Sequence, residues 1–435
     1  MAQYRTDTKK LDGASLVTRH EVMMLSDRLS PSGTLTDAFG RLRVSNPQTL
    51  FDSQHRYQDN GLWNTSNTAS SNTEYKTNES AVDLNVDTTS GHYVYRETAK
   101  VFAYQPGKSL LIMNTFAMNT PKANLRQRVG YFSSQNGVFF ENDGTTNYLV
   151  LRSYTTGAVV ETRVAQSNWN VDKFDGGGYS AQGKTGEHTS GIDVTKTNIF
   201  WIDVEWLGVG DVRCGFVVDG LMIPAHIFHN DNLRNTTYMT TACLPCRYEI
   251  ENTGTTTSNS TLKQICTTVI SEGGYSLVGK QTAVITPLGT PKDIPTAGTF
   301  VPMISIRLRP DKLDAIVIPE EVVLLGLTNN TKYVYKVVVG GTLDANASWV
   351  NVGTTAVQYD ISATGYTGGV DAAGGYLVVS SGAGASPIRV GSNLFENQLQ
   401  RNSFTNTATI FSLVATGASN GDDAVGGISW EEIFR

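Results

Sequence analysis

The chain has 435 residues, a formal net charge of −6 and only 17% charged residues, while glycine and small polar residues are abundant. A chain of this length is too long for one ordinary domain, so we expect two compact units and a tail. An acidic balance without a basic stripe excludes bulk nucleic-acid binding, and no apolar run is long enough to span a membrane. The polar start MAQYRTDTKKLDG does not resemble a signal peptide. We therefore expect no nucleic-acid partner, no membrane partner and no cofactor.

Residues 1–45 carry little hydrophobic periodicity, so we expect an extended N-terminal arm that becomes ordered on a partner. In this arm, bulky apolar and cationic residues alternate over Phe39, Arg41, Leu42 and Arg43. We predict that the two apolar side chains anchor in a pocket of a neighbour and that the arginines pair with acidic groups around it. The alternative is that this stretch is simply the first strand of the following domain.

Strand signals dominate the rest of the chain. Residues 128–142 contain two apolar runs around Asn136-Gly137, which predicts a β-hairpin. Further short runs rich in β-branched and aromatic residues predict strands at 147–154, 199–208, 212–220, 332–341 and 375–382. The best helix candidate is 18–29, within the arm. Many short strands and few helices predict an all-β chain with two β-sandwich or jelly-roll domains.

We place the first sandwich at 46–285 and the second at 301–435. The stretch between them, 286–300, contains Pro287, Pro291 and Pro295 and is predicted to be a linker.

The stretch GYSAQGKT (178–185) has the spacing of a phosphate-binding loop. Such a loop needs a buried strand before it and a helix after it, because the helix N-terminus and loop amides surround the phosphates. Polar residues precede this stretch, and glycines and β-branched residues follow it. We therefore predict an exposed loop between strands without nucleotide.

Trp201, Asp203 and Glu205 alternate along one predicted strand and share a face, while Ile202, Val204 and Trp206 form the core face. This spacing resembles the E-x-D-x-E strand of concanavalin-like glycosidases, but tryptophan stands in the first acidic position. Since one of the two catalytic carboxylates is missing, we expect no hydrolysis and no enzyme. The three outward side chains remain candidates for a glycan groove; the simpler alternative is an ordinary strand face.

Metal-ligand signals are weak. Cys243 and Cys246 have CxxC spacing without a second ligand pair, so we expect buried free thiols. His226 and His229 are three residues apart in a strand-like context, which puts them on opposite faces. We expect no metal site.

Several long segments resemble structural proteins of tailed bacteriophages, especially phages of aquatic bacteria. They are SDRLSPSGTLTDAFGRLRVSNPQTLFDSQHRY (26–57), the segments 197–232 and 238–254, and the terminal GISWEEIFR. The resemblance implies a concanavalin-like β-sandwich (jelly roll) at 46–285, a virion location, a homo-oligomer (a trimer is favoured) and contacts with other virion proteins. It implies no catalytic residues.

The leading prediction is a non-enzymatic virion protein of the tail, baseplate or fibre-attachment region. The alternatives are a capsid decoration or head-fibre protein and a module that binds a glycan receptor on the host surface. A glycan-degrading enzyme is disfavoured by the missing carboxylate.

Overall fold

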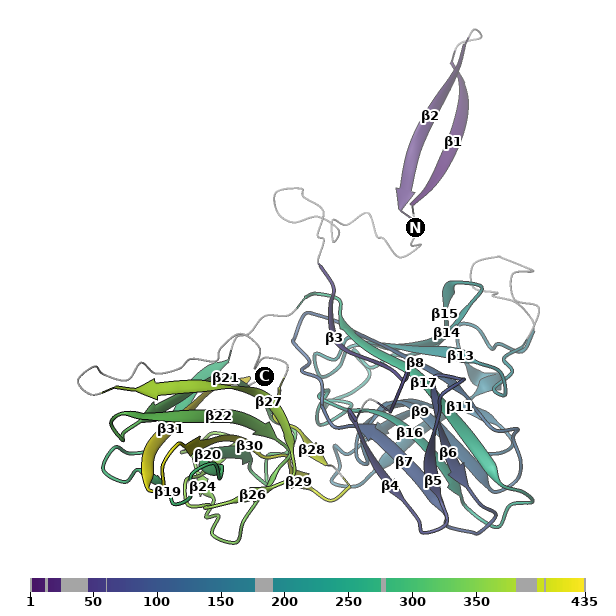
Figure 1. The fold of residues 1–435 in the computed structure, drawn as a ribbon. Coiled ribbons are helices and arrows are strands. Elements are labelled where there is room, and N and C mark those ends of the chain that lie inside the picture. The colour runs from purple at the N-terminus through teal and green to yellow at the C-terminus, as the bar shows by residue number, and fades with distance from the viewer. Residues whose placement is uncertain are drawn as a thin grey trace. The chain divides into compact units, whose positions relative to one another are not determined.

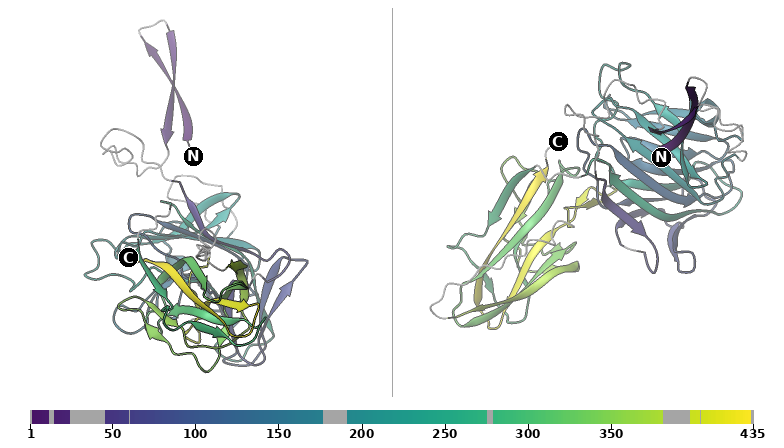
Figure 2. Two further views of the ribbon diagram at one scale, coloured as in Figure 1. Left: turned by 60° about the vertical axis from the view of Figure 1, so that its left-hand side comes forward. Right: turned by 90° about the horizontal axis from the view of Figure 1, so that it is seen from above.

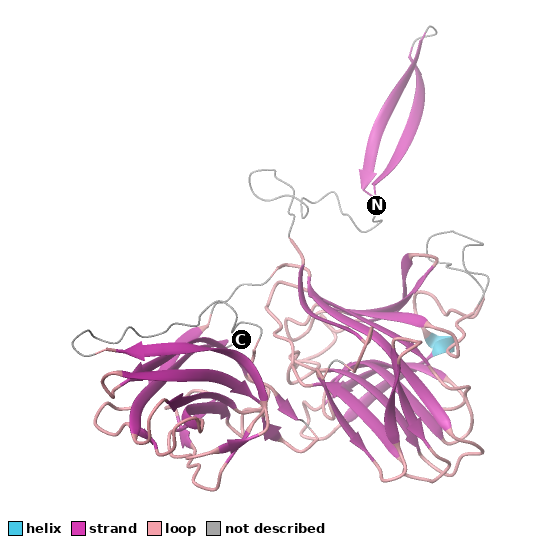
Figure 3. Cartoon of the chain, in the orientation of Figure 1, coloured by secondary structure: helices cyan, strands magenta, loops and turns pink. Residues whose placement is uncertain are grey.

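The computed structural model describes residues 2–11, 15–24, 46–59, 61–176, 191–274, 279–380, 397–402 and 404–433. The chain divides into two units, 1–46 and 47–435. Strands make up nearly all regular structure (Figure 3), and in the described part of the chain the only helix is the single 3-10 turn η1 (Gln166–Asn168). The prediction of an all-β chain is confirmed. None of the described helices is long and apolar enough to cross a membrane.

The N-terminal unit contains one antiparallel hairpin, formed by β1 (Ala2–Leu11) and β2 (Ser15–Met24). The predicted helix at 18–29 is wrong over 18–24, because residues 15–24 pair as a strand with the start of the chain, and 25–29 lie outside the described residues. Phe39, Arg41, Leu42 and Arg43 lie outside the described residues. Their role as an interface stays a prediction.

The first sandwich consists of two antiparallel sheets (Figure 1). The seven-stranded sheet has the order β12 (Val160–Ala165), β11 (Asn147–Ser153), β10 (Gly137–Asn142), β9 (Leu125–Phe132), β16 (Cys246–Asn252), β7 (Tyr93–Thr98) and β4 (Trp63–Asn67). The eight-stranded sheet has the order β15 (Leu221–Phe228), β14 (Val212–Val218), β13 (Asn198–Val204), β8 (Leu110–Ala117), β17 (Ser260–Ser271), β6 (Ala81–Val86) and β5 (Asn72–Lys76), with β3 (Gln48–Gln54) paired to β17. The predicted hairpin at 128–142 is confirmed as β9 and β10.

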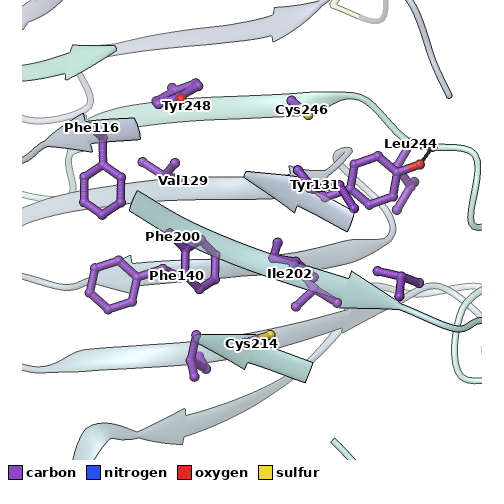
Figure 4. Packing of buried hydrophobic residues seen from close by; sticks show 14 of the residues in the cluster. Phe116, Val129, Tyr131, Phe140, Phe200, Ile202, Cys214, Leu244, Cys246 and Tyr248 are labelled. Carbon is purple, nitrogen blue, oxygen red and sulfur yellow. Dashed lines mark hydrogen bonds between the residues drawn. The ribbon is translucent and has the colours of Figure 1, made fainter. Parts of the chain in front are cut away.

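Alternate residues of these strands point into one shared core, as the period of two in a half-buried strand requires. Val129 and Tyr131 of β9 face Phe200 and Ile202 of β13 across the interior (Figure 4), and all four are at most 1% exposed. The Tyr131 hydroxyl donates to the Ala242 carbonyl at 2.7 Å and accepts from the Leu244 amide at 3.1 Å. The hydroxyl is thereby satisfied inside an apolar core.

The second sandwich has its own core and two main sheets (Figure 2). One contains β18 (Lys280–Ile285), β31 (Asp422–Ile433), β19 (Lys292–Ile294) and β21 (Ile316–Gly326). The other contains β24 (Val350–Asn351), β25 (Val357–Asp360), β20 (Val301–Leu308), β30 (Phe411–Gly417), β22 (Thr331–Val339) and β27 (Val370–Val379). Two short pairs complete it: β23 (Thr342–Leu343) with β26 (Tyr366–Thr367), and β28 (Arg401–Asn402) with β29 (Thr407–Ala408).

The predicted linker at 286–300 is wrong. Strands β18 and β19, which flank and enter this stretch, both pair with β31 near the end of the chain. Ile294 is fully buried in the second core. The second sandwich therefore begins at β18, about residue 280, rather than at 301. Pro287 and Pro291 lie in the turn between β18 and β19, and Pro295 directly follows β19, so none of the three removes a ladder hydrogen bond.

Candidate functional site

The outer face of the seven-stranded sheet, opposite the core, carries a row of charged and aromatic side chains. The strand register places Tyr95, Glu249, Arg128, Glu141 and Tyr148 opposite one another on β7, β16, β9, β10 and β11. Their immediate neighbours along the strands, such as Val129 and Tyr248, belong to the core. The alternation of the pleat thus puts two tyrosines at the ends of a Glu–Arg–Glu sequence that crosses three adjacent strands.

Buried ion pairs hold this row in place. Arg128 Nε lies 2.5 Å from Glu141 Oε2, and Arg128 Nη1 lies 3.4 Å from Glu249 Oε2. In the next row, Arg247 Nε lies 2.6 Å from Glu249 Oε1 and Arg247 Nη1 lies 3.2 Å from Glu97 Oε2. We call these five residues, Glu97, Arg128, Glu141, Arg247 and Glu249, the charged centre. Every side chain in it is at most 8% exposed.

Aromatic rings fill the space beside the charged centre. Phe132 and Phe139 pack against each other with ring centroids 4.4 Å apart. The guanidinium of Arg128 lies 5.2 Å from the Phe139 ring, and that of Arg152 lies 4.9 Å from it. Gly130 makes room for this arrangement, since a Cβ there would lie only 2.5 Å from the Val138 carbonyl and 2.7 Å from Phe139 Cβ. The guanidiniums are thus fixed by rings as well as by carboxylates.

The protonation states follow from this packing. Burial alone would raise the pKa of Glu249, but the guanidiniums of Arg247, Arg128 and Arg152 outweigh it and hold the pKa below its usual value. Burial raises the pKa of Glu97 in spite of Arg247 and Arg401. The pKa of Tyr95 is raised by burial and by the carboxylates of Glu249 and Glu251, so its hydroxyl stays protonated and donates to Glu251 at 2.8 Å.

One margin of the face is accessible. We call Tyr93, Arg126, Asp143, Arg163 and Glu251 the open rim. Their charged side chains are 20–37% exposed, in contrast to the centre. Arg126 Nη2 lies 2.6 Å from Glu251 Oε2, and Arg163 pairs with Glu141 and Asp143. The Tyr93 ring stacks on Tyr95 at 4.2 Å, and the Arg163 guanidinium lies 4.0 Å from the Tyr148 ring.

The opposite margin is closed by the segment around β28. Arg401 Nη1 lies 3.3 Å from Glu97 Oε1, and Arg401 Nη2 lies 3.0 Å from Asp314 Oδ1. The Phe404 ring lies 5.1 Å from the Arg247 guanidinium. A ligand of the face therefore has access from the open rim.

The sequence-predicted groove lies on the other sheet. Asp203 shares the outer face of β13 with Trp201, while Phe200, Ile202 and Val204 face the core. Trp201 is only 5% exposed: it packs over Gly215, and its Nε1 donates to the Phe216 carbonyl at 3.3 Å. This ring offers no free face for stacking on a sugar, so its predicted role is corrected.

Asp203 and Glu205 remain at the end of β13. Burial, with a contribution from Glu272, raises the pKa of Asp203 to about 6, although Arg213 Nη1 lies 3.8 Å away. Glu205 is exposed. Their role in glycan binding stays a prediction.

The two histidines have separate environments. His226 is 8% exposed in β15 and accepts from the Asn170 amide at 3.2 Å. His229 lies beyond the strand, with Nδ1 3.0 Å from Asp211 Oδ2. The ligand atoms of Asp211, His229 and Asp231 lie within 4.8 Å of one another, so these residues could hold a cation. The sequence pattern missed Asp211, which precedes β14.

The cysteines and the GYSAQGKT stretch were the remaining sequence motifs. Cys214 and Cys246 are buried free thiols, Cys243 is partly buried and Cys266 is exposed. The GYSAQGKT stretch (178–185) lies outside the described residues.

Comparisons with known proteins concern the fold. No protein-family model matches the chain, and no curated protein matches it. Similar solved structures include an endo-β-1,4-glucuronan lyase from the fungus Trichoderma reesei (12% identity, 51% of this chain and 95% of that one, TM-score 0.34). They also include a carbohydrate esterase from the Shiga toxin-encoding bacteriophage phi24B (12%, 52% and 100%, TM-score 0.30) and the carbohydrate recognition domain of Emp47p (10%, 50% and 90%, TM-score 0.29).

These comparisons contradict the prediction that the chain is not an enzyme. The similar structures include a lyase, an esterase and a glycosyl hydrolase family protein from Mycobacterium fortuitum. The prediction rested on one incomplete motif on β13. The resemblance to phage virion proteins stays a prediction.

Proposed function

We propose that the chain is a glycan-binding protein of a tailed-bacteriophage particle and that the first sandwich binds a host-surface glycan at the open rim of the charged face. The observation that carries the proposal is the Tyr–Glu–Arg–Glu–Tyr row with its accessible margin. The sequence resemblance supports the virion setting. A location in the tail, baseplate or fibre-attachment region and assembly as a homo-oligomer, with a trimer favoured, belong to the same proposal.

Sugars suit this surface because of their chemistry. A pyranose offers hydroxyls that donate and accept, and it offers a flat face of C–H groups. Arginine supplies only donors and an ionised carboxylate only acceptors, so an Arg–Glu pair such as Arg126–Glu251 can engage both sides of a hydroxyl group. The half-exposed rings of Tyr93 and Tyr95 supply an apolar surface next to a polar one.

The surface is also preorganised. The rim side chains are tied to one another and to the buried centre, as in the pairing of Arg163 with Glu141. Side chains that are already fixed lose little rotamer entropy when a ligand binds. This supports weak, repeated recognition of a polymer by an oligomeric particle protein, in which several modest sites act together.

Affinity electrophoresis of the full chain in gels that contain soluble host polysaccharides tests the proposal. We expect at least one polysaccharide to retard the wild type and not Tyr93→Ala. The matched control is Tyr376→Ala, which removes an exposed tyrosine of the second sandwich and should leave retardation unchanged. The proposal would be contradicted if no polysaccharide of a broad panel retarded the wild type, or if both variants lost retardation equally.

A further inference from the structure

The charges on the face are matched almost one to one. The cations are Arg126, Arg128, Arg152, Arg163, Arg247 and Arg401, and the carboxylates are Glu97, Glu141, Asp143, Glu161, Glu249, Glu251 and Asp314, six cations against seven carboxylates. Each of these arginines has a carboxylate oxygen within 3.2 Å. The face as a whole therefore has no positive excess to attract a polyanion.

The two cations of the open rim are already neutralised. Arg126 is paired with Glu251, and Arg163 is paired with Glu141 and Asp143. An anionic sugar that approached either guanidinium would have to displace a protein carboxylate and would meet that carboxylate at close range. Like charges at such distances repel, and the partly buried position limits screening by salt.

Titration does not relieve this repulsion at neutral pH. The pKa of Asp143 lies below its usual value because hydrogen bonds from Thr146 and Thr145 and the charge of Arg163 outweigh its burial. Burial acts against Glu161 too, but Arg128 and Arg152 hold its pKa below the usual value. Both groups stay ionised above pH 5, since ordinary carboxyl pKa values are about 4.

We infer that the open rim binds a neutral, hydroxyl-rich glycan and rejects polyanionic chains such as polyuronates and sulfated polysaccharides. This inference rests on the proposed function and names its ligand class. A neutral hydroxyl needs no counter-charge: it donates to a carboxylate and accepts from a guanidinium without breaking the ion pair between them. Binding of this kind depends little on salt, because no counterions are released.

The test compares neutral polysaccharides (a dextran and a galactomannan) with anionic ones (a polyglucuronate and a sulfated galactan). Retardation of the full chain is measured at 20 mM and 500 mM NaCl, salt concentrations that span strong and weak screening. We expect retardation by a neutral polymer, changed less than about twofold by salt, and none by the anionic polymers. Binding to an anionic polymer that weakens about tenfold or more in salt would overturn the inference and leave the proposed function standing. If no glycan binds at all, the proposed function fails, and the inference fails with it.

A pair of rim variants sharpens the test. Glu251→Gln leaves Arg126 without its carboxylate partner. We expect retardation of this variant by polyglucuronate to be about threefold or more stronger than that of the wild type at 20 mM NaCl. Arg126→Gln, at the same ion pair, should show no such gain. Circular dichroism checks that both variants are folded. Equal behaviour of the two variants toward polyglucuronate would contradict the inference, because it would mean that the ion pair does not control charge selection.

Discussion

The substitution Arg128→Met removes the guanidinium at the middle of the charged centre. Arg128 is 6% exposed and has Glu141, Glu249 and Glu161 within 2.5–3.7 Å of its nitrogens. Methionine has a similar length but no charge, so the packing against Phe139 is largely kept. The variant therefore isolates the electrostatic part of the interaction.

The expected loss of stability follows from the two buried carboxylates that lose a partner. Glu141 and Glu249 are at most 5% exposed and would each lose one of their arginine partners, although Arg163 and Arg247 remain. Removing one member of a buried ion pair costs about 3–5 kcal/mol. Because second arginines remain, we expect the lower end, about 3 kcal/mol. At about 2–4 °C per kcal/mol for a domain of this size, the melting temperature of the first sandwich should fall by roughly 6–12 °C.

Differential scanning calorimetry of the full chain at pH 7 measures this shift. The matched control is Arg126→Met on the open rim, whose ion pair is partly solvated and should contribute less than about 1 kcal/mol. The difference in melting temperature between the Arg128→Met protein and the wild type should shrink as the pH falls toward 4. The carboxylates of Glu141 and Glu249, which have lost a partner, can then take up protons. Equal effects of the two substitutions at pH 7 would refute the reasoning, since they would mean that the centre is solvated like the rim.

Three further predictions concern other parts of the chain. Trp201→Ala should cost about 3–5 kcal/mol of stability and leave glycan retardation of the folded protein unchanged; a selective loss of binding would restore Trp201 as a site residue. His55 is 1% exposed, and burial together with Arg96 lowers its pKa to about 4, so the stability conferred by its neutral ring is complete above about pH 6.5 and is lost as the pH falls toward 4. His55→Gln should flatten the melting temperature between pH 7 and pH 4, and parallel profiles would contradict this. Deletion of 1–46 should leave the melting transitions of the remaining chain within about 2 °C, because those residues form a separate unit; a larger shift would show that the unit stabilises the sandwiches.

The sandwich strands were predictable because their signal is local. Phe200, Ile202 and Val204 alternate with outward residues, and this period of two survives whatever the partner strand is. One error arose where the pairing partner is remote in the sequence. Ile294 belongs to a three-residue strand that is held only by β31, more than 120 residues later. A second error is local: the mixed pattern of 18–29 did not show that residues 15–24 pair with the preceding strand, residues 2–11, in a hairpin.

The charged face was missed because its pairing partners are remote in the sequence. Its local signals are present in the sequence: Arg126 and Arg128 are two residues apart on β9, and Arg247, Glu249 and Glu251 follow the same period on β16. Alternation alone predicts that each set shares a face. It does not show that β9 pairs with β16, which brings Arg128 and Glu249 together across 121 residues of chain. Without that pairing, the arginines and glutamates look like unrelated solvated charges.

The most direct test of the central claim is a crystal structure of the chain with a neutral oligosaccharide taken from the polysaccharide that retards it. We predict density for the sugar on the outer face of the seven-stranded sheet, in contact with Tyr93 and the Arg126–Glu251 pair, with that ion pair intact. Density on the outer face of the eight-stranded sheet near Asp203 and Glu205, or on the second sandwich, would contradict the account.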